Sequence, residues 1–355
     1  MDRKQGLQIF FIVMAVVLTL LFISLVIYSF SIFLLIFAGI LVAIFFSNIS
    51  DYLNEKTFLP RAVALALSVI FILGIIIGLG FIAGPQIANQ FDLLFERIPE
   101  ALSTFEQTLQ QYDWGQRLLE QTAPGQQWIS RGTEIIGEVT GVFSTTLGFA
   151  LNTLLVLVLG VYLASNPSVY IQGIYFLIPQ SKQDRAQEVV RALGRAIHWW
   201  LLGRLGMMVI VGFMTATGLY LLNVPLALLL GFLAFLFSFV PVIGPIASAI
   251  PAILIGWLQG TTTALYVILL YIIVQSLESY LITPNIQRRA VFIPPAILIF
   301  AQVLMAFLAG LLGVFLATPL SVVIVVLIQM LYVEDVLGYE VKLLGEHLPS
   351  ADTYI

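Results

Sequence analysis

The stretch 239–251, "FVPVIGPIASAIP", decides how this sequence is interpreted. It lies in one of the most apolar regions of the chain and yet contains Pro241, Gly244, Pro245 and Pro251. A helix surrounded by lipid must satisfy its own backbone hydrogen bonds, and each proline removes one donor. The composition therefore predicts a broken helix at membrane depth, in a place where protein or a water-filled cavity covers the exposed backbone.

The composition of the whole chain indicates a membrane protein. Of its 355 residues, 60% are hydrophobic and 10% are charged, and the mean hydropathy is +1.05. The chain has no cysteine and only two histidines, and it contains no P-loop, H-E-x-x-H or G-x-S-x-G motif. The net charge of -4 gives no reason to expect a nucleic-acid partner. We therefore expect neither an enzyme nor a bound metal or cofactor.

Apolar segments of nearly the length that crosses a bilayer, about 20 residues, recur along the chain. Two of the later segments, 226–257 and 294–331, are too long for a single span, and both contain glycine and proline near their middles. The sequence therefore predicts an all-α polytopic membrane protein with about eight membrane segments. These are residues 9–28, 32–46, 62–83, 142–164, 207–222, 226–257, 264–282 and 294–331.

The distribution of charge predicts which loops lie in the cytoplasm. Lysine and arginine flank the first two apolar segments and dominate between residues 164 and 207, whereas acidic residues dominate between 85 and 141. Both termini are expected to be cytoplasmic. The predicted division is 1–84, N-terminal transmembrane helices; 85–141, an extracytoplasmic amphipathic helical segment; 142–164, a transmembrane helix; 165–206, a cytoplasmic amphipathic segment; 207–331, a transport core; and 332–355, a cytoplasmic tail.

This orientation makes the two longest apolar segments re-entrant hairpins. Segment 226–257 must enter and leave the membrane on the outer side, and segment 294–331 on the inner side, which is the pattern of an inverted repeat. The sequence "IGPIASAIPAILIG" (243–256) is similar to "LGVFLATPLSVVIV" (312–325), with an offset of one residue between glycine and proline. Half-helix ends of this kind bind solutes and ions in transporters, although turns that only shape the fold are the alternative.

One acidic residue, Glu278, lies inside the apolar region. Tyr271, Gln275 and Glu278 fall on one face of the expected helix. A carboxylate within a span costs about 2.5 to 3.5 kcal/mol on insertion scales, so it usually faces a cavity, a partner or a proton path. Glu278 is therefore either a proton or cation carrier or a gate residue, or it pairs with Arg288 or Arg289 near the inner interface.

Several of these motifs together resemble a known family. The stretches "FVPVIGPIASAIPAILIG", "QSLESYLITPNI", "GLLGVFLATPLSVVIVVL" and "YVEDVLG" resemble, in this order, the autoinducer-2 exporter (AI-2E) family, also called PerM-like permeases. The resemblance extends over nearly the whole chain. It implies transport or gating roles for Pro241, Gly244, Pro245, Pro251, Gln275, Glu278, Pro284, Gly310, Gly313 and Pro319.

The resemblance also implies an inner-membrane transporter that is a homo-oligomer, with a pentamer as one expected form. Our leading expectation is a secondary transporter that exports a small polar solute similar to autoinducer-2 and couples this export to the proton gradient. One alternative is a Na+(Li+)/H+ antiporter. The other is a membrane scaffold that transports nothing. The expected partners are the lipid bilayer, the solute, H+ or Na+, and further copies of the chain.

Overall fold

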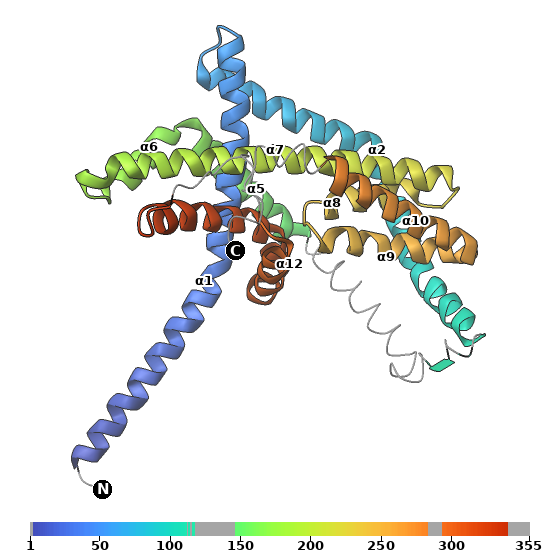
Figure 1. Ribbon diagram of the computed structural model, residues 1–355, viewed down its shortest axis with the longest axis horizontal. Coiled ribbons are helices and arrows are strands. Elements are labelled where there is room, and N and C mark those ends of the chain that lie inside the picture. The colour runs from blue at the N-terminus through green and yellow to red at the C-terminus, as the bar shows by residue number, and fades with distance from the viewer. Residues whose placement is uncertain (1–2, 112, 114–115, 118–145, 283–292, 340–355) are drawn as a thin grey trace.

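The computed structural model describes residues 3–111, 113, 116–117, 146–282 and 293–339 (Figure 1). Within these ranges the chain forms helices and no strand. The α-helices are α1 (Arg3–Lys56), α2 (Arg61–Gln110), α5 (Thr146–Ser165), α6 (Pro167–Phe176), α7 (Gln183–Leu221), α8 (Ala227–Phe237), α9 (Ile243–Leu258), α10 (Thr261–Leu277) and α12 (Pro295–Leu327). The short segments are the 3-10 turn η1 (Gln180–Lys182) and the π-helical η2 (Glu278–Ile282) and η3 (Ile328–Glu334).

The length and composition of the helices confirm the predicted all-α polytopic membrane fold. Five described helices are long and apolar enough to cross a bilayer, or six if α5 and α6, bent by 80° from each other, form one broken span. Large apolar side chains such as Ile82 on α2 and Phe213 on α7 are exposed. Exposed apolar surface of this extent marks contact with lipid. α8 and α9 are each shorter than a span, as expected for the two arms of a hairpin.

Several helices are longer than the predicted segments. Segments 9–28 and 32–46 lie on one continuous helix, α1, and α2 runs through Pro85 and Pro99. The boundary at 206 falls inside α7. A change from apolar to amphipathic composition does not end a helix, because the backbone hydrogen bonds continue across it. The division into six parts and its sidedness stay predictions, and residues 118–141 and 340–355 of it lie outside the described residues.

Close helix packing is achieved through small residues. Gly39 of α1 and Gly160 of α5 face each other so tightly that a methyl group on Gly160 would overlap Val42. Gly231 of α8 lies in the same way against Ala216 of α7. Small residues at such contacts let helix backbones approach closely, which is how helices associate in lipid. α7, which runs across the molecule in Figure 1, is thus bound firmly to α8.

The two predicted breaks lie in the two expected segments. The first broken hairpin consists of α8 and α9, and its helices are separated by residues 238–242, the first break. The second broken hairpin is α12, whose helical geometry is interrupted at residues 309–310, the second break. Each hairpin therefore has one arm before its break and one arm after it. Membrane entry from opposite sides stays a prediction.

Candidate functional site

The first break contains a strained turn. Val242 has φ 67° and ψ -61°, and the amide of Ile243 donates to the carbonyl of Pro241 at 2.8 Å. This is a γ-turn with positive φ, a rare conformation for a β-branched residue that costs about 1–3 kcal/mol. Two residues later, Gly244 lies so close to the carbonyl oxygen of Phe237 that no Cβ could be accommodated. The surrounding contacts must hold this turn in place.

A buried ion pair lies beside the first break. Arg204 of α7 approaches Glu278 of η2, with 3.5 Å between Nη1 and Oε1, and each side chain is only 8% exposed. The Nε of Arg204 also donates to the carbonyl of Phe239 at 3.0 Å. Two buried charges are tolerated when they are paired and hydrogen-bonded. Arg204 thus connects the carboxylate of Glu278 to the backbone of the first break.

Contacts from α7 and α12 enclose the same break. Gln302 of α12, which is fully buried, donates from Nε2 to the carbonyl of Pro241 at 2.8 Å. The ring of Phe239 stacks on Phe315 of α12, with ring centres 5.7 Å apart, and meets the ring of Trp200 of α7 edge-on at the same distance. The first break is therefore held by hydrogen bonds and by aromatic rings from two other helices.

α10 contributes a further contact to the first broken hairpin. Tyr271 donates its hydroxyl to the carbonyl of Ser248 in α9 at 3.0 Å, and Ser248 donates to the carbonyl of Pro245 at 3.0 Å. Gln275 lies on the same face of α10, and its Nε2 is 3.5 Å from the hydroxyl of Ser279. Glu278 follows at the start of the π-helical turn η2, a type of turn that is frequent at functional sites.

The second half of α2 packs on the first broken hairpin. Leu94 and Ile98 of α2 are buried in one apolar cluster with Leu229 of α8. Gln90 accepts the backbone amide of Leu229 at 2.9 Å, in the first turn of α8, where the amides have no intrahelical partner. The amphipathic face predicted in segment 85–141 therefore lies on neighbouring helices.

The second break is built from different residues. Ala309 has φ -144° and ψ 19°, and Gly310 has φ 57° and ψ -140°, a conformation that favours glycine. Past the break, Gly313 lies against the carbonyl oxygen of Met305 so closely that a Cβ would overlap it. The chain thus folds back on itself, since residues eight apart in a straight helix do not touch. Pro319 lies inside the second arm and is buried.

Comparison with known proteins identifies the family. Residues 9–332 match the family described as AI-2E family transporter. The chain belongs to the AI-2E transporter family. It is 23% identical over 304 residues to YueF, a candidate transport protein of Bacillus subtilis (strain 168), and the match covers 82% of each chain. It is 25% identical over 310 residues to YrrI of the same organism, which covers 82% of this chain and 85% of the relative.

A shorter match carries higher identity. MT0215, a candidate transport protein of Mycobacterium tuberculosis (strain CDC 1551 / Oshkosh), is 36% identical over 146 residues, which are 40% of this chain and 39% of the relative. The family confirms the resemblance inferred from the motifs. Together with the span-length helices, it makes the chain a multi-pass protein of a membrane transport family.

The structure brings some of the residues implied by the AI-2E resemblance together. Pro241 and Gly244 flank the strained turn, and Glu278 reaches it through Arg204. Gly310, Gly313 and Pro319 lie in the second broken hairpin. Pro251 lies inside α9, where it removes the amide that would serve the carbonyl of residue 247. Pro284, Arg288 and Arg289 lie outside the described residues.

The sequence interpretation missed two polar residues of this AI-2E protein. Arg204 was counted only among the positive charges of the cytoplasmic side, yet it is buried against Glu278. Its position in "WWLLGRLGMMV", a cation between apolar residues on both sides, was the available signal. Gln302 is the one amide side chain in the apolar run 294–327, and a buried amide requires a partner. Trp200 also packs on the first break.

Polar atoms without a hydrogen-bond partner gather at the first break. Among the described buried side chains they include Nη2 of Arg204, Oγ of Ser238, Oε2 of Glu278 and Oε1 of Gln302. Such atoms mark positions where water or a polar solute can bind, because leaving them unsatisfied costs about 1–3 kcal/mol each. The described residues contain no group of three or more His, Asp or Glu placed to hold a metal ion.

Proposed function

We propose that the protein is a secondary transporter of the inner membrane that exports a small polar solute and couples this export to the proton gradient. Both termini are cytoplasmic in this proposal. The observation that carries it is the buried pair of Arg204 and Glu278 at the first break. A carboxylate at this depth costs free energy, and intramembrane carboxylates commonly relay protons or line substrate paths.

The contacts of Arg204 suggest how a proton would act. One guanidinium group bonds both to Glu278 and to the carbonyl of Phe239 in the first break. Protonation of Glu278 removes the negative charge that holds Arg204, so it changes the contacts of the first break. In this mechanism the two broken hairpins form opposing gates around the solute. The AI-2E relatives are named as transport proteins, and these names support a transport role. The furanone signal autoinducer-2 is the first solute to test.

The Na+(Li+)/H+ antiporter is the second candidate, and one observation supports it. Glu278 has a carboxylate oxygen without a partner among the described residues, next to the irregular backbone of the first break. Carboxylate and carbonyl oxygens are ligands for hard cations. However, Arg204 already compensates the charge of Glu278, which disfavours a bound cation. We therefore rank solute export first.

A homo-oligomer, expected as a pentamer, belongs to the same proposal and is tested by light scattering of the purified protein.

Reconstituted vesicles test the proposal. The purified protein is placed in liposomes loaded with labelled autoinducer-2, and efflux is measured with and without an imposed pH gradient. We expect the gradient to accelerate efflux for the native protein but not for Glu278→Gln. The control is Arg191→Gln, which changes an exposed charge of α7. Equal efflux from Glu278→Gln and native protein at every pH would refute the proton role.

Two other outcomes identify the alternatives. A fluorescent pH dye inside empty proteoliposomes reports proton movement when sodium or lithium is added. A cation-dependent signal without autoinducer-2 efflux would establish the antiporter in place of the exporter. If neither flux occurs and the prolines of both hairpins tolerate replacement, the protein is a scaffold.

A further inference from the structure

Gln302 occupies an unusual position in the second broken hairpin. It lies on the arm before the second break, within an apolar helix, and its side chain is fully buried. A buried amide is costly unless it is hydrogen-bonded. Its Nε2 donates to the carbonyl of Pro241, which is 61 residues away in sequence and belongs to the other hairpin.

The acceptor of this hydrogen bond is the carbonyl that closes the strained turn. The oxygen of Pro241 accepts the amide of Ile243 at 2.8 Å, with Val242 at positive φ between them, and it accepts Nε2 of Gln302 at 2.8 Å. A carbonyl oxygen has two lone pairs, so both bonds can form together. Gln302 therefore stabilises an unfavourable backbone conformation in the first broken hairpin from its position in the second.

A second contact joins the same two hairpins. Phe239 of the first break stacks on Phe315, which lies on the arm of α12 after the second break. The first break thus touches both arms of α12: Gln302 on the arm before the second break and Phe315 on the arm after it. A change in the angle between these arms cannot leave both contacts intact.

We infer that Gln302 is a positioning residue that couples the two broken hairpins, so that the first break keeps its strained turn only while it is seated on α12. This inference rests on the proposed function in one respect, since it treats the hairpins as gates. Movement of either hairpin breaks the bond to Pro241 and releases the strain at Val242. The two gates then change conformation together, as alternating access requires.

The chain offers a direct measurement because it has no cysteine of its own. Ser238, in the first break, is 1% exposed, and its hydroxyl has no partner among the described residues, so Ser238→Cys provides a single buried thiol there. A small methanethiosulfonate reagent labels this thiol only when the first break has separated from α12. When the break returns to α12 faster than the reagent reacts, the labelling rate is proportional to the population of the separated state. No solute is needed, so this test can fail or succeed independently of the transport assay.

We expect Gln302→Met to increase the labelling rate of Ser238→Cys about tenfold, the effect of losing about one buried hydrogen bond. Phe315→Leu, which removes the aromatic contact without affecting a buried amide, should increase the rate about threefold to tenfold. The matched control is Gln329→Leu, an amide in η3 that is partly buried. This control should leave the rate unchanged.

A second thiol distinguishes uncoupling from general loosening. Ser68 of α2 is also 1% exposed, and its hydroxyl donates to the carbonyl of Ala64 in the same helix, so Ser68→Cys reports opening at a second place. Gln302→Met should leave its labelling rate within about twofold of the native rate, since opening there is a separate local event. The inference is overturned if Gln302→Met leaves Ser238→Cys at the native rate, raises both thiols equally, or acts no more strongly than Gln329→Leu.

Discussion

The two broken hairpins are similar in one contact and different in nearly everything that surrounds them. In each, a glycine past the break, Gly244 or Gly313, packs against a backbone carbonyl from before the break. A proline follows, Pro251 after seven residues in the first hairpin and Pro319 after six in the second. The correspondence falls on the stretches whose sequences are similar, and this agreement favours the predicted internal repeat, which stays a prediction.

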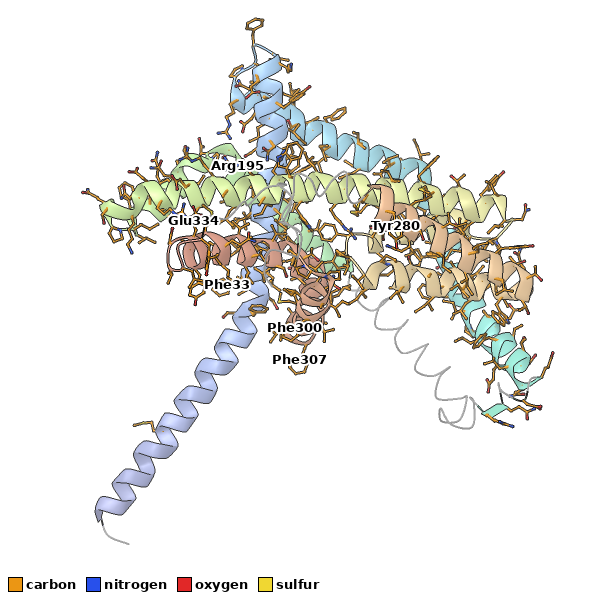
Figure 2. The ribbon with its side chains drawn as sticks, in the orientation of Figure 1. Phe33, Arg195, Tyr280, Phe300, Phe307 and Glu334 are labelled. Carbon is orange, nitrogen blue, oxygen red and sulfur yellow. The ribbon has the colours of Figure 1, made fainter. Side chains whose placement is uncertain are left out.

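The differences lie in what holds each break. The helices of the first hairpin are covered by α2, α7 and α10, and its break is fixed by polar contacts from Arg204 of α7 and Gln302 of α12. The second uses Gly310 in its break, and its first arm is largely exposed: Figure 2 shows Phe300 and Phe307 projecting from it, and Phe307 is 89% exposed. In the proposed mechanism, the polar, enclosed first break carries the binding chemistry, and the second hairpin, with its apolar, exposed arm, has more freedom to move.

The largest predicted effect comes from removing the buried charge pair, which is found at the first break. Arg204→Met leaves the Glu278 carboxylate buried without its counter-charge, so it should lower the free energy of unfolding by about 3–5 kcal/mol. Arg191→Met, on an exposed face of the same helix, should change it by less than about 0.5 kcal/mol. Denaturation in detergent measures both. The double variant Arg204→Met/Glu278→Leu should recover most of the loss, and no recovery would contradict a direct pair.

The next effect tests the similarity of the hairpins. Gly244→Ala and Gly313→Ala each place a methyl group against a backbone carbonyl that cannot move aside as a side chain could. Each should cost about 1–3 kcal/mol of stability, visible as a lower melting temperature. Gly78→Ala of α2, where the added methyl meets open space, is the control and should be neutral or slightly stabilising, because alanine favours a helix more than glycine does. A neutral Gly313→Ala would show that only the first hairpin is tightly folded back.

A smaller effect concerns the backbone of the second break. Gly310→Ala forces an alanine to positive φ and should cost about 1 to 2 kcal/mol. Because Gln302 and Phe315, on the two arms of α12, both contact the first break, we expect this variant to lower the melting temperature and also to speed the labelling of Ser238→Cys. Labelling at the native rate would mean that the angle between the arms of α12 does not control the contact with the first break.

The smallest effect concerns the cover of the first hairpin by α2. Gln90→Leu removes the acceptor for the amide of Leu229 in the first turn of α8 and should cost about 1 kcal/mol. Gln86→Leu, one turn earlier and exposed, is the matched control. Equal melting temperatures for the two variants would show that the hydrogen bond from Gln90 contributes nothing to the packing of α2 on the first hairpin.

The sequence predicted the class of fold and the places of both breaks, because proline and glycine within apolar runs act locally on the backbone. The distribution of lysine and arginine between the loops fixed an orientation in which the same two segments had to be hairpins. The partner of Glu278 could not be predicted, because contacts between residues 74 apart depend on how α7 and η2 pack. The same holds for Gln302 and Pro241. One helix end was also misjudged, since Pro85 is accommodated inside α2.

One measurement in proteoliposomes tests the central claim most directly. It is the ratio of solute efflux with a pH gradient to efflux without one, compared between the native protein and Glu278→Gln. The claim is that the buried Arg204–Glu278 pair links protonation to the first break. It predicts a ratio well above one for the native protein and a ratio of one for Glu278→Gln, with both proteins equally folded. The same ratio above one in both proteins would contradict it.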